Sequence, residues 1–107
     1  LLKEINFGHW EGQIWDELPN TDPEEFAARK ADPYRWRPRN GESYEDLAKR
    51  VGNWLASLER DTVAVSHGGV SRVVRGHVLG LDWGQIHNLD VPQDRILQLR
   101  RGEQKWL

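Results

Sequence analysis

The stretch from Thr62 to Gly76, TVAVSHGGVSRVVRG, constrains the fold of this 107-residue chain more than any other segment. It begins with a short, uncharged run rich in β-branched residues, which is typical of a strand buried on both faces of a helix-covered sheet. After two glycines, residues return at the i, i+3, i+4 and i+7 spacing of one helix face: Val70, Val73, Val74 and His77. The sequence therefore predicts a strand over 62–66 and a helix over about 70–80.

His67 lies at the junction between this strand and this helix. In open α/β sheets ligands bind at the carboxyl ends of the strands, and the first N–H groups of the next helix point toward an anion held there. Gly68 and Gly69 allow the backbone to come close to such a ligand. The pattern predicts an anion site at His67, and the alternative is an ordinary loop histidine in a tight turn.

Two further helices are indicated upstream. Thr21-Asp22-Pro23-Glu24 offers a capping box with proline in the first turn and predicts a helix to about Ala31. The segment 33–41 is broken by two prolines and a glycine and is predicted to be a loop. The next helix begins at Ser43, where Asp46 completes a capping box. Its apolar face is expected to carry Leu47, Val51, Trp54, Leu55 and Leu58.

Two strands are predicted at the end of the chain. The first is expected near Arg95–Leu99, and Arg101-Gly102 turns the chain toward a short last strand. Helices alternating with strands indicate a layered α/β fold. The strand over 62–66 needs neighbours that the chain does not obviously supply, so we expect a segment preceding Leu1 or another chain, as in a homo-oligomer, to cover it.

Composition limits the classes of function. The formal charge of −2 and the pI near 6.1 argue against a nucleic-acid binder, and no segment is apolar enough for a membrane span. Arginine outnumbers lysine by 11 to 4, which suits phosphate or carboxylate ligands, although codon bias would explain the same ratio. The lack of cysteine excludes disulfides and favours the cytoplasm. The chain has no methionine and begins with LLKE, so we expect it to be a processed chain, a cut chain or one part of a larger protein.

Three segments in this order resemble the second half of a histidine phosphatase. They are LLKEINFGHWEG at 1–12, GESYEDLAKRV at 41–51 and VSHGGVSR at 65–72. The superfamily includes cofactor-dependent phosphoglycerate mutases, alpha-ribazole phosphatases and broad phosphomonoesterases. The resemblance implies a three-layer α/β/α phosphoglycerate mutase-like fold, with 1–107 as the C-terminal portion of a single domain that is incomplete at its N-terminus.

The resemblance also implies catalytic roles. In the family, a histidine in an Arg-His-Gly motif attacks phosphorus, and none of the four histidines here has those flanks. We therefore expect the nucleophile before Leu1 and expect 1–107 alone to be inactive. Glu4, which opens the Glu-x-x-(Phe/Tyr)-Gly motif, corresponds to the proton donor, and its alternative is a surface glutamate. His67 corresponds to the second histidine that binds the phosphoryl group, with the Gly68 amide beside it.

Phosphoryl transfer explains why these residue types are needed. Charge develops on the equatorial oxygens, so cationic groups and oriented amides stabilise the transition state. An alkoxide leaving group needs a proton, and a positioned carboxylic acid contributes roughly 10²–10⁴-fold. No cofactor is implied, and no pair of residues has the spacing of a zinc site.

Several other residues are candidates for substrate binding. Phe7 belongs to the glutamate motif, and Trp15, like Trp10 and Trp36, would either wall a pocket or fill the core. Arg37 and Arg39 lie on the proline-broken loop and would either grip a second anionic group or remain solvated. We expect the other histidines to serve as a satisfied helix residue, His77, and as loop residues, His9 and His87.

A small phosphorylated molecule is the expected substrate. Phosphoglycerate mutases usually have Arg-His-Tyr after the glutamate, a lysine further on and an asparagine after His-Gly. Here these places hold Ile5-Asn6-Phe7, Trp15 and Gly69, which favours hydrolysis and is nearest the alpha-ribazole phosphatase branch. The alternatives are a mutase, a non-catalytic phosphate-binding or regulatory chain, and a fragment that works only with a missing half.

Overall fold

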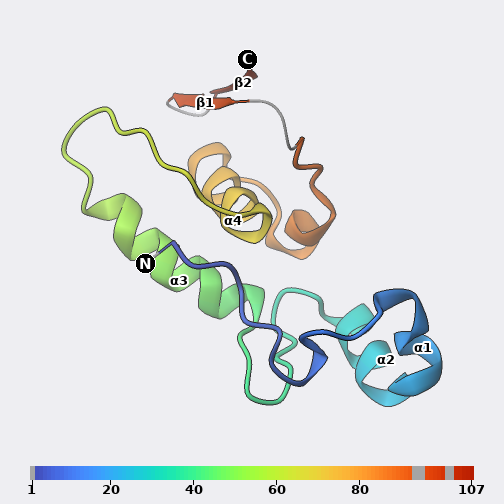
Figure 1. Cartoon of the computed structure of the whole chain (residues 1–107). Coiled ribbons are helices and arrows are strands. Elements are labelled where there is room, and N and C mark those ends of the chain that lie inside the picture. Colours follow the sequence, from blue (N-terminus) through green and yellow to red (C-terminus); the bar gives the residue numbers. More distant parts are fainter. Residues whose placement is uncertain (1, 93–95, 101–102) are drawn as a thin grey trace.

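Two long helices, α3 (Tyr44–Ala56) and α4 (Gly68–Leu79), form the centre of the structure (Figure 1). The structure, a computed structural model, describes residues 2–92, 96–100 and 103–107. The two helices pack against each other through apolar faces and, with residues from other segments, bury the core. The core residues are Ile5, Tyr44, Leu47, Ala48, Val51, Val70, Val73 and Ile86. This core fixes the N-terminal segment, which supplies Ile5, against both helices.

The start of α3 confirms the predicted capping box. The Asp46 N–H donates to Ser43 Oγ, and the Ser43 N–H donates to Asp46 Oδ2, each at 3.0 Å. The helix ends at Ala56, so the predicted apolar face was wrong at Leu58, which lies beyond the helix and is 36% exposed.

Helix α4 confirms the helix predicted after His67. His67 has extended backbone and is the N-cap residue, so the helix begins two positions before Val70. Gly80 ends it in the left-handed conformation, with φ of +66°. His77 is satisfied as expected, because its Nε2 lies 2.8 Å from the carbonyl oxygen of Ala48 on α3.

The segment upstream forms a separate end of the molecule (Figure 1), with helices α1 (Leu18–Thr21) and α2 (Pro23–Ala31). The capping box predicted at Thr21–Glu24 was wrong. The Thr21 hydroxyl donates a hydrogen bond to the Glu17 carbonyl instead. The Asp22 side chain does not cap α2 either, because its carboxylate is hydrogen-bonded to the side chains of His9 and Trp10. The chain changes direction at Asp22, between the two helices.

Within the described residues, three short 3-10 helices complete the helical part: η1 (Gly8–Trp10), η2 (Trp15–Glu17) and η3 (Trp83–Asn88). The two predicted C-terminal strands are present as β1 (Leu97–Arg100) and β2 (Glu103–Trp106), which pair antiparallel with Leu97 opposite Trp106. The predicted residues Arg95, Arg101 and Gly102 lie outside the described residues. The hairpin packs on α4, where the Arg75 guanidinium lies 5.4 Å from the centre of the Trp106 indole.

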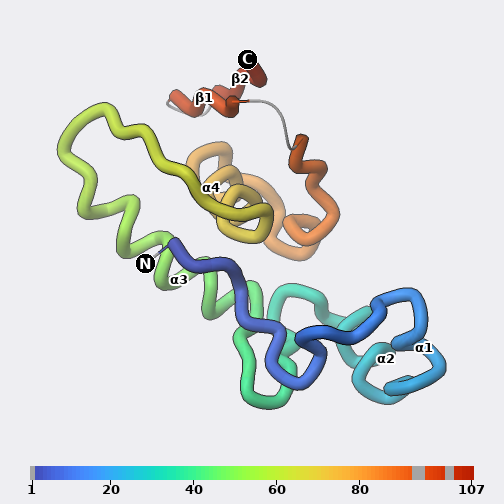
Figure 2. The backbone as a smooth tube through the Cα atoms, viewed as in Figure 1, coloured from blue at the N-terminus to red at the C-terminus, as the bar shows by residue number. Residues whose placement is uncertain are grey.

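The predicted buried strand over 62–66 was wrong for the described part of the chain. Residues 61–67 lie in neither a helix nor a strand, and Val63 and Val65 are 96% and 95% exposed. Figure 2 shows this segment as an arm that leaves the end of α3 and returns to the start of α4. A strand requires a hydrogen-bonded neighbour, and among the described residues only β1 and β2 are paired as strands.

Candidate active site

The Glu4 carboxylate lies at the N-terminal end of α4. Its Oε2 accepts a hydrogen bond from the Gly69 N–H at 3.1 Å, and its Oε1 accepts one from the Ile5 N–H at 2.9 Å. The first N–H groups of a helix have no partner within the helix and attract negative charge. Glu4 is thus held at the helix end predicted to bind an anion.

Gly69 leaves no space between this helix end and Glu4. A Cβ added to Gly69 would overlap Glu4 Oε1 and lie 3.4 Å from Ile5 Cγ2. Any other residue at this position would therefore displace the carboxylate or the segment that carries it.

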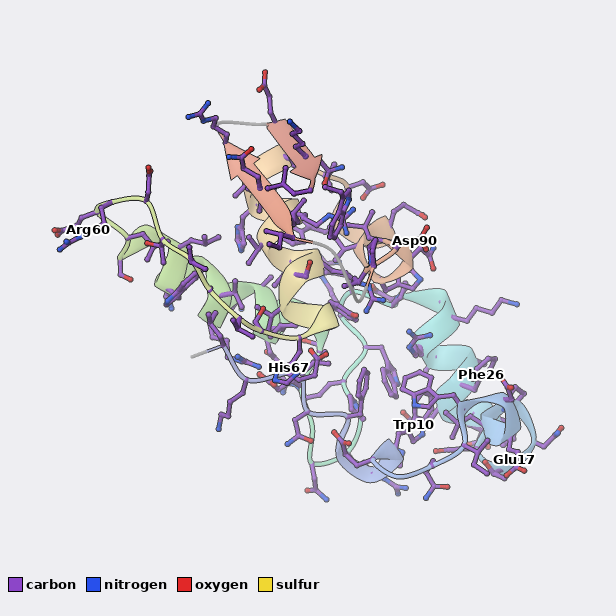
Figure 3. The ribbon with its side chains drawn as sticks, turned by 45° about the horizontal axis from the view of Figure 1, so that its top comes forward. Trp10, Glu17, Phe26, Arg60, His67 and Asp90 are labelled. Atoms are coloured by element: carbon purple, nitrogen blue, oxygen red, sulfur yellow. The ribbon has the colours of Figure 1, made fainter. Side chains whose placement is uncertain are left out.

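His67 lies two positions before Gly69, the hydrogen-bond partner of Glu4, and its side chain is exposed. Figure 3 shows it at the start of α4, where the exposed arm ends. Gly68 follows it as the first residue of the helix. The structure thus brings the predicted proton donor and the predicted phosphate-binding histidine to one end of one helix.

Arg72, one turn further along α4, adds positive charge to this end. Its Nε donates to the Leu89 carbonyl at 2.8 Å, and its Nη1 donates to the Tyr44 hydroxyl at 3.3 Å. The same Nη1 would lie 3.7 Å from a Cβ added to Gly68. These contacts hold the guanidinium beside the start of the helix.

Arg29 and His87 lie near Arg72 and form with it what we call the cationic cluster. Burial lowers the pKa of Arg29; Tyr44 opposes this shift, and the positive charge of Arg72 adds to it. Burial also lowers the pKa of His87, followed by the charges of Arg29 and Arg72. The Nδ1 atom of His87 is buried with no hydrogen-bond partner. The cluster therefore contains two guanidinium charges close enough to lower the pKa of a neighbouring histidine, and one of its buried polar atoms is unsatisfied.

The tryptophans form an aromatic cluster around Trp10, which is 1% exposed. Trp10 lies 4.4 Å from Trp36 and 5.3 Å from Trp15 between ring centroids, and Phe7 lies 5.0 Å from Trp15. Trp10 and Trp36 donate through Nε1 to Asp22 and Glu25. Figure 3 shows Trp10 near α2, apart from His67. Trp10 thus fills the core of this end of the molecule.

Phe7 and Trp15 connect the aromatic cluster to the cationic one. Phe7 is partly buried against the main core, and Trp15 is 38% exposed. The Arg29 guanidinium lies 5.1 Å from the centre of the Trp15 ring, within the range of a cation–π contact. Phe7 and Trp15 therefore remain candidates for substrate contact.

The loop arginines do not point to the proposed site. Arg37 donates from Nε and Nη2 to both oxygens of Asp46, at 2.8 and 2.7 Å, and this pairing raises its pKa. The backbone N–H of Arg39 donates to His9 Nδ1 at 2.9 Å. Arg39 lines a separate hollow of about 260 Å³, whose lining includes neither Glu4 nor His67.

The remaining histidines occupy 3-10 helices rather than the loops expected for them. His9 lies in η1 and His87 in η3. His9 accepts from the Arg39 N–H, so its Nε2, 3.1 Å from Asp22 Oδ2, is the nitrogen that can donate to that carboxylate.

The described residues contain no group of three His, Cys, Asp or Glu side chains arranged to hold a metal ion. None of the helices that they form is long and apolar enough to span a membrane.

Sequence reasoning missed the cationic cluster. Arg29, Arg72 and His87 come from α2, α4 and η3, and only the folded chain brings them together. One signal was present: Arg72 follows His67 by five positions, so it had to lie within the first turns of the predicted helix.

Known proteins with similar sequences identify the family of this chain. The sequence model described as Histidine phosphatase superfamily (branch 1) matches residues 1–107. The 6-phosphofructo-2-kinase 1 of Saccharomyces cerevisiae is 36% identical over 97 residues, covering 86% of this chain and 12% of that protein. The 6-phosphofructo-2-kinase/fructose-2,6-bisphosphatase 1 of Rattus norvegicus is 35% identical over 100 residues, covering 92% of this chain and 21% of that protein.

A solved structure shows the same fold. The alpha-ribazole phosphatase from Shigella flexneri superposes with a TM-score of 0.76 at 24% identity, covering 99% of this chain and 56% of that one. This likeness confirms the predicted α/β, phosphoglycerate mutase-like fold. The chain spans about half the length of this structure and a smaller part of the two relatives.

Proposed function

The chain belongs to the histidine phosphatase superfamily, branch 1, and from this we propose that it is part of a phosphomonoester hydrolase that works through a phosphohistidine intermediate. Residues 1–107 contain no Arg-His-Gly motif, so the nucleophilic histidine of the complete enzyme is supplied by a segment outside them. The observation that carries the proposal is the position of the Glu4 carboxylate at the helix end that begins with His67.

The proposed reaction divides the work among three groups. The nucleophilic histidine forms a bond to phosphorus while the bond to the leaving oxygen breaks, and Glu4 gives its proton to that oxygen. His67 and the Gly68 N–H at the start of α4 stabilise the charge on the transferring phosphoryl group. Glu4, now ionised, then takes a proton from the water that attacks the phosphohistidine, which releases inorganic phosphate and restores both groups.

The cationic cluster supports a narrower substrate class. Arg72 lies beside Gly68 at the start of α4, and its positive charge is close enough to Arg29 to lower the pKa of that residue. A second anionic group on the substrate would relieve the repulsion between these cations and offer a partner to His87. A compound with two acidic groups, such as a sugar bisphosphate, therefore suits the site better than an alkyl phosphate whose alkyl group is uncharged, and the fructose-2,6-bisphosphatase named among the relatives agrees with this choice.

The alternatives are a mutase and a non-catalytic phosphate-binding chain. A mutase would transfer the phosphoryl group to a second hydroxyl of the substrate, whereas a hydrolase releases inorganic phosphate. A binding chain would have no nucleophile in the complete protein.

Trapping the intermediate tests the proposal. The complete enzyme is mixed with para-nitrophenyl phosphate, quenched in alkali, in which phosphohistidine persists, and analysed by mass spectrometry for a phosphate adduct on histidine. We expect an adduct that forms faster than inorganic phosphate is released in the steady state. Absence of any adduct in Glu4→Gln, in which hydrolysis of the intermediate is slowed, would refute the mechanism.

A second comparison tests the substrate class. Arg29→Gln should raise KM for a sugar bisphosphate by about tenfold, since a charged hydrogen bond contributes roughly 1.5–3 kcal/mol. The KM for para-nitrophenyl phosphate should change by less than about threefold. Equal changes for both substrates would show that the cationic cluster does not bind a second anionic group.

A further inference from the structure

We propose that Glu42 and Arg50 are positioning residues that hold Glu4 in place for proton transfer, an inference that rests on the proposed function. Arg50 lies on α3, and its Nη2 donates to the carbonyl oxygen of Lys3 at 2.6 Å and to that of Glu4 at 3.3 Å. The guanidinium thus fixes the backbone on the N-terminal side of the Glu4 side chain and at Glu4 itself.

Glu42 fixes the backbone on the other side. Its Oε1 accepts from the Asn6 N–H at 3.1 Å, and its own N–H donates to the Asn6 carbonyl at 2.7 Å. Glu4 is therefore held between two anchored backbone positions, Lys3 and Asn6. This leaves its carboxylate facing the Gly69 N–H.

The two positioning residues also fix each other. Arg50 Nε lies 2.9 Å from Glu42 Oε2, and Arg50 Nη2 lies 3.1 Å from Glu42 Oε1, which is a two-point contact between a planar guanidinium and a carboxylate. Their side chains are 24% and 26% exposed. Each side chain thus reaches the backbone around Glu4 in a fixed orientation rather than as a mobile surface group.

Close packing of two backbone segments prevents the Glu4 segment from shifting relative to Glu42 and Arg50. A Cβ added to Gly41, next to Glu42, would lie 2.6 Å from the Asn6 carbonyl oxygen and 2.7 Å from the Gly8 nitrogen. Gly8 has φ of +54°, and a Cβ there would overlap the Arg39 carbonyl. Glycine on both sides lets the two backbones touch, so the loop and the Glu4 segment move as one.

The consequence for catalysis follows from the sensitivity of proton transfer to geometry. A catalytic group displaced by about 1 Å loses on the order of 10²-fold in rate. Loss of the Arg50 contacts releases Lys3 and Glu4 but changes none of the phosphate-binding groups on α4. In the first step, formation of the phosphohistidine, the defect should therefore appear where the leaving group needs a proton and be small where it does not.

The experiment compares two substrates in the complete enzyme. Arg50→Gln should lower kcat for an alkyl phosphate by about 10–10²-fold. The burst of nitrophenol from para-nitrophenyl phosphate, which reports formation of the phosphohistidine before its hydrolysis, should slow by less than about threefold. Arg50→Lys, which keeps the charge on a single donor nitrogen, should recover part of the loss. Arg35→Gln is the matched control, because it removes the exposed pair of Arg35 with Glu45 between the same loop and the same helix, and it should leave the ratio of these two rates unchanged.

A double variant separates this inference from the proposed function. Adding Arg50→Gln to Glu4→Gln should cause no further loss of kcat on the alkyl phosphate, since the acid that Arg50 positions has already been replaced by an amide. If Glu4→Gln alone lacks leaving-group dependence, the proposed acid is wrong. If Glu4→Gln shows that dependence and Arg50→Gln lowers kcat for the alkyl phosphate and the nitrophenol burst rate equally, the pair only stabilises the fold and the inference is overturned. Glu42→Gln, which preserves the shape of the side chain, gives the same two outcomes if Arg50→Gln does not fold.

Discussion

Glu4 and Gly69 are joined by a hydrogen bond of 3.1 Å from the Gly69 N–H to the Glu4 carboxylate, although 65 positions separate them in the sequence. The bond connects the segment of the glutamate motif to the turn after His67. Two sequence motifs that would otherwise be independent thus share one helix end.

Gly69→Ala tests how tightly this contact is built. The added methyl group would overlap Glu4 Oε1, so the carboxylate must leave its position on the helix. We expect kcat of the complete enzyme on an alkyl phosphate to fall by about tenfold or more, with the midpoint of thermal unfolding lowered as well. Gly80→Ala is a control for the loss of a glycine at the other end of α4, because a Cβ there meets no other atom and only the backbone conformation is strained. Equal activity in Gly69→Ala and the parent enzyme would show that the carboxylate is free to move.

Glu4→Gln tests the proton donor. General-acid catalysis contributes roughly 10²–10⁴-fold, so kcat on an alkyl phosphate should fall within that range. On para-nitrophenyl phosphate, whose leaving group hardly needs a proton, the formation of the phosphoenzyme measured as a burst of nitrophenol should change by less than about threefold. Equal losses in the two bursts would assign Glu4 another role.

His67→Ala tests the phosphate-binding role of the exposed histidine at the start of α4. A group that stabilises charge acts on the bound anion and on the transition state, so the variant should weaken vanadate inhibition and lower kcat/KM together, each by roughly 10²-fold. His77→Ala is the control, since it removes a histidine of α4 that contacts the Ala48 carbonyl. Unchanged vanadate inhibition in His67→Ala would reduce His67 to a turn residue.

The ion pair between Glu42 and Arg50 predicts a dependence of stability on acid. The hydrogen bond from Arg50 is the largest cause that lowers the pKa of Glu42; burial opposes it, and the Asn6 N–H adds to it. A carboxyl with a depressed folded-state pKa stabilises the protein above its unfolded value, about 4.3, and loses this contribution as pH falls through the folded-state value.

Denaturant titrations across this range measure the effect. The free energy of unfolding should fall between about pH 5 and pH 2 in the parent, and the fall should be smaller in Glu42→Gln. Glu24→Gln removes an exposed glutamate in the first turn of α2 and serves as the control. An identical acid dependence in Glu42→Gln and the parent would mean that the pair contributes nothing to stability.

Residues 1–107 alone should have no phosphatase turnover. A proton donor and phosphate-binding groups cannot replace an attacking group, and no histidine here has the flanks of the nucleophile motif. The assay is hydrolysis of para-nitrophenyl phosphate by the purified chain, repeated after the segment with the nucleophile is added. Robust turnover by the chain alone would place the nucleophile among its own histidines.

Local signals in the sequence predicted the two central helices well. The capping box of Ser43 with Asp46, and the valines of α4, specify structure within one or two turns, so neighbouring residues suffice. The capping box at Thr21 failed because Asp22 is drawn away by His9 and Trp10, which lie 13 and 12 positions earlier.

Contacts between distant segments were beyond sequence reasoning. The motif resemblance identified Glu4 and His67 as candidates, but the Gly69 contact, the cationic cluster and the anchoring of Lys3 by Arg50 depend on tertiary packing. Residues 62–66 have strand composition, yet composition does not supply a neighbour, and in the described structure they lie outside any strand and are exposed.

The exposed arm at 62–66 can be covered by a strand of the same polypeptide or by a strand of another molecule. The yield of folded monomer therefore depends on which of the two strands pairs with the arm faster. Val63 and Val65 are almost fully exposed, and covering each would contribute roughly 1.5–3 kcal/mol, so any compatible strand that reaches the arm first is favoured. A strand tethered in the same polypeptide arrives at a rate that does not depend on protein concentration, whereas a strand from another molecule arrives faster as concentration rises. Dilution during refolding should therefore favour the monomer, and crowding of chains during synthesis should favour exchange of strands between copies.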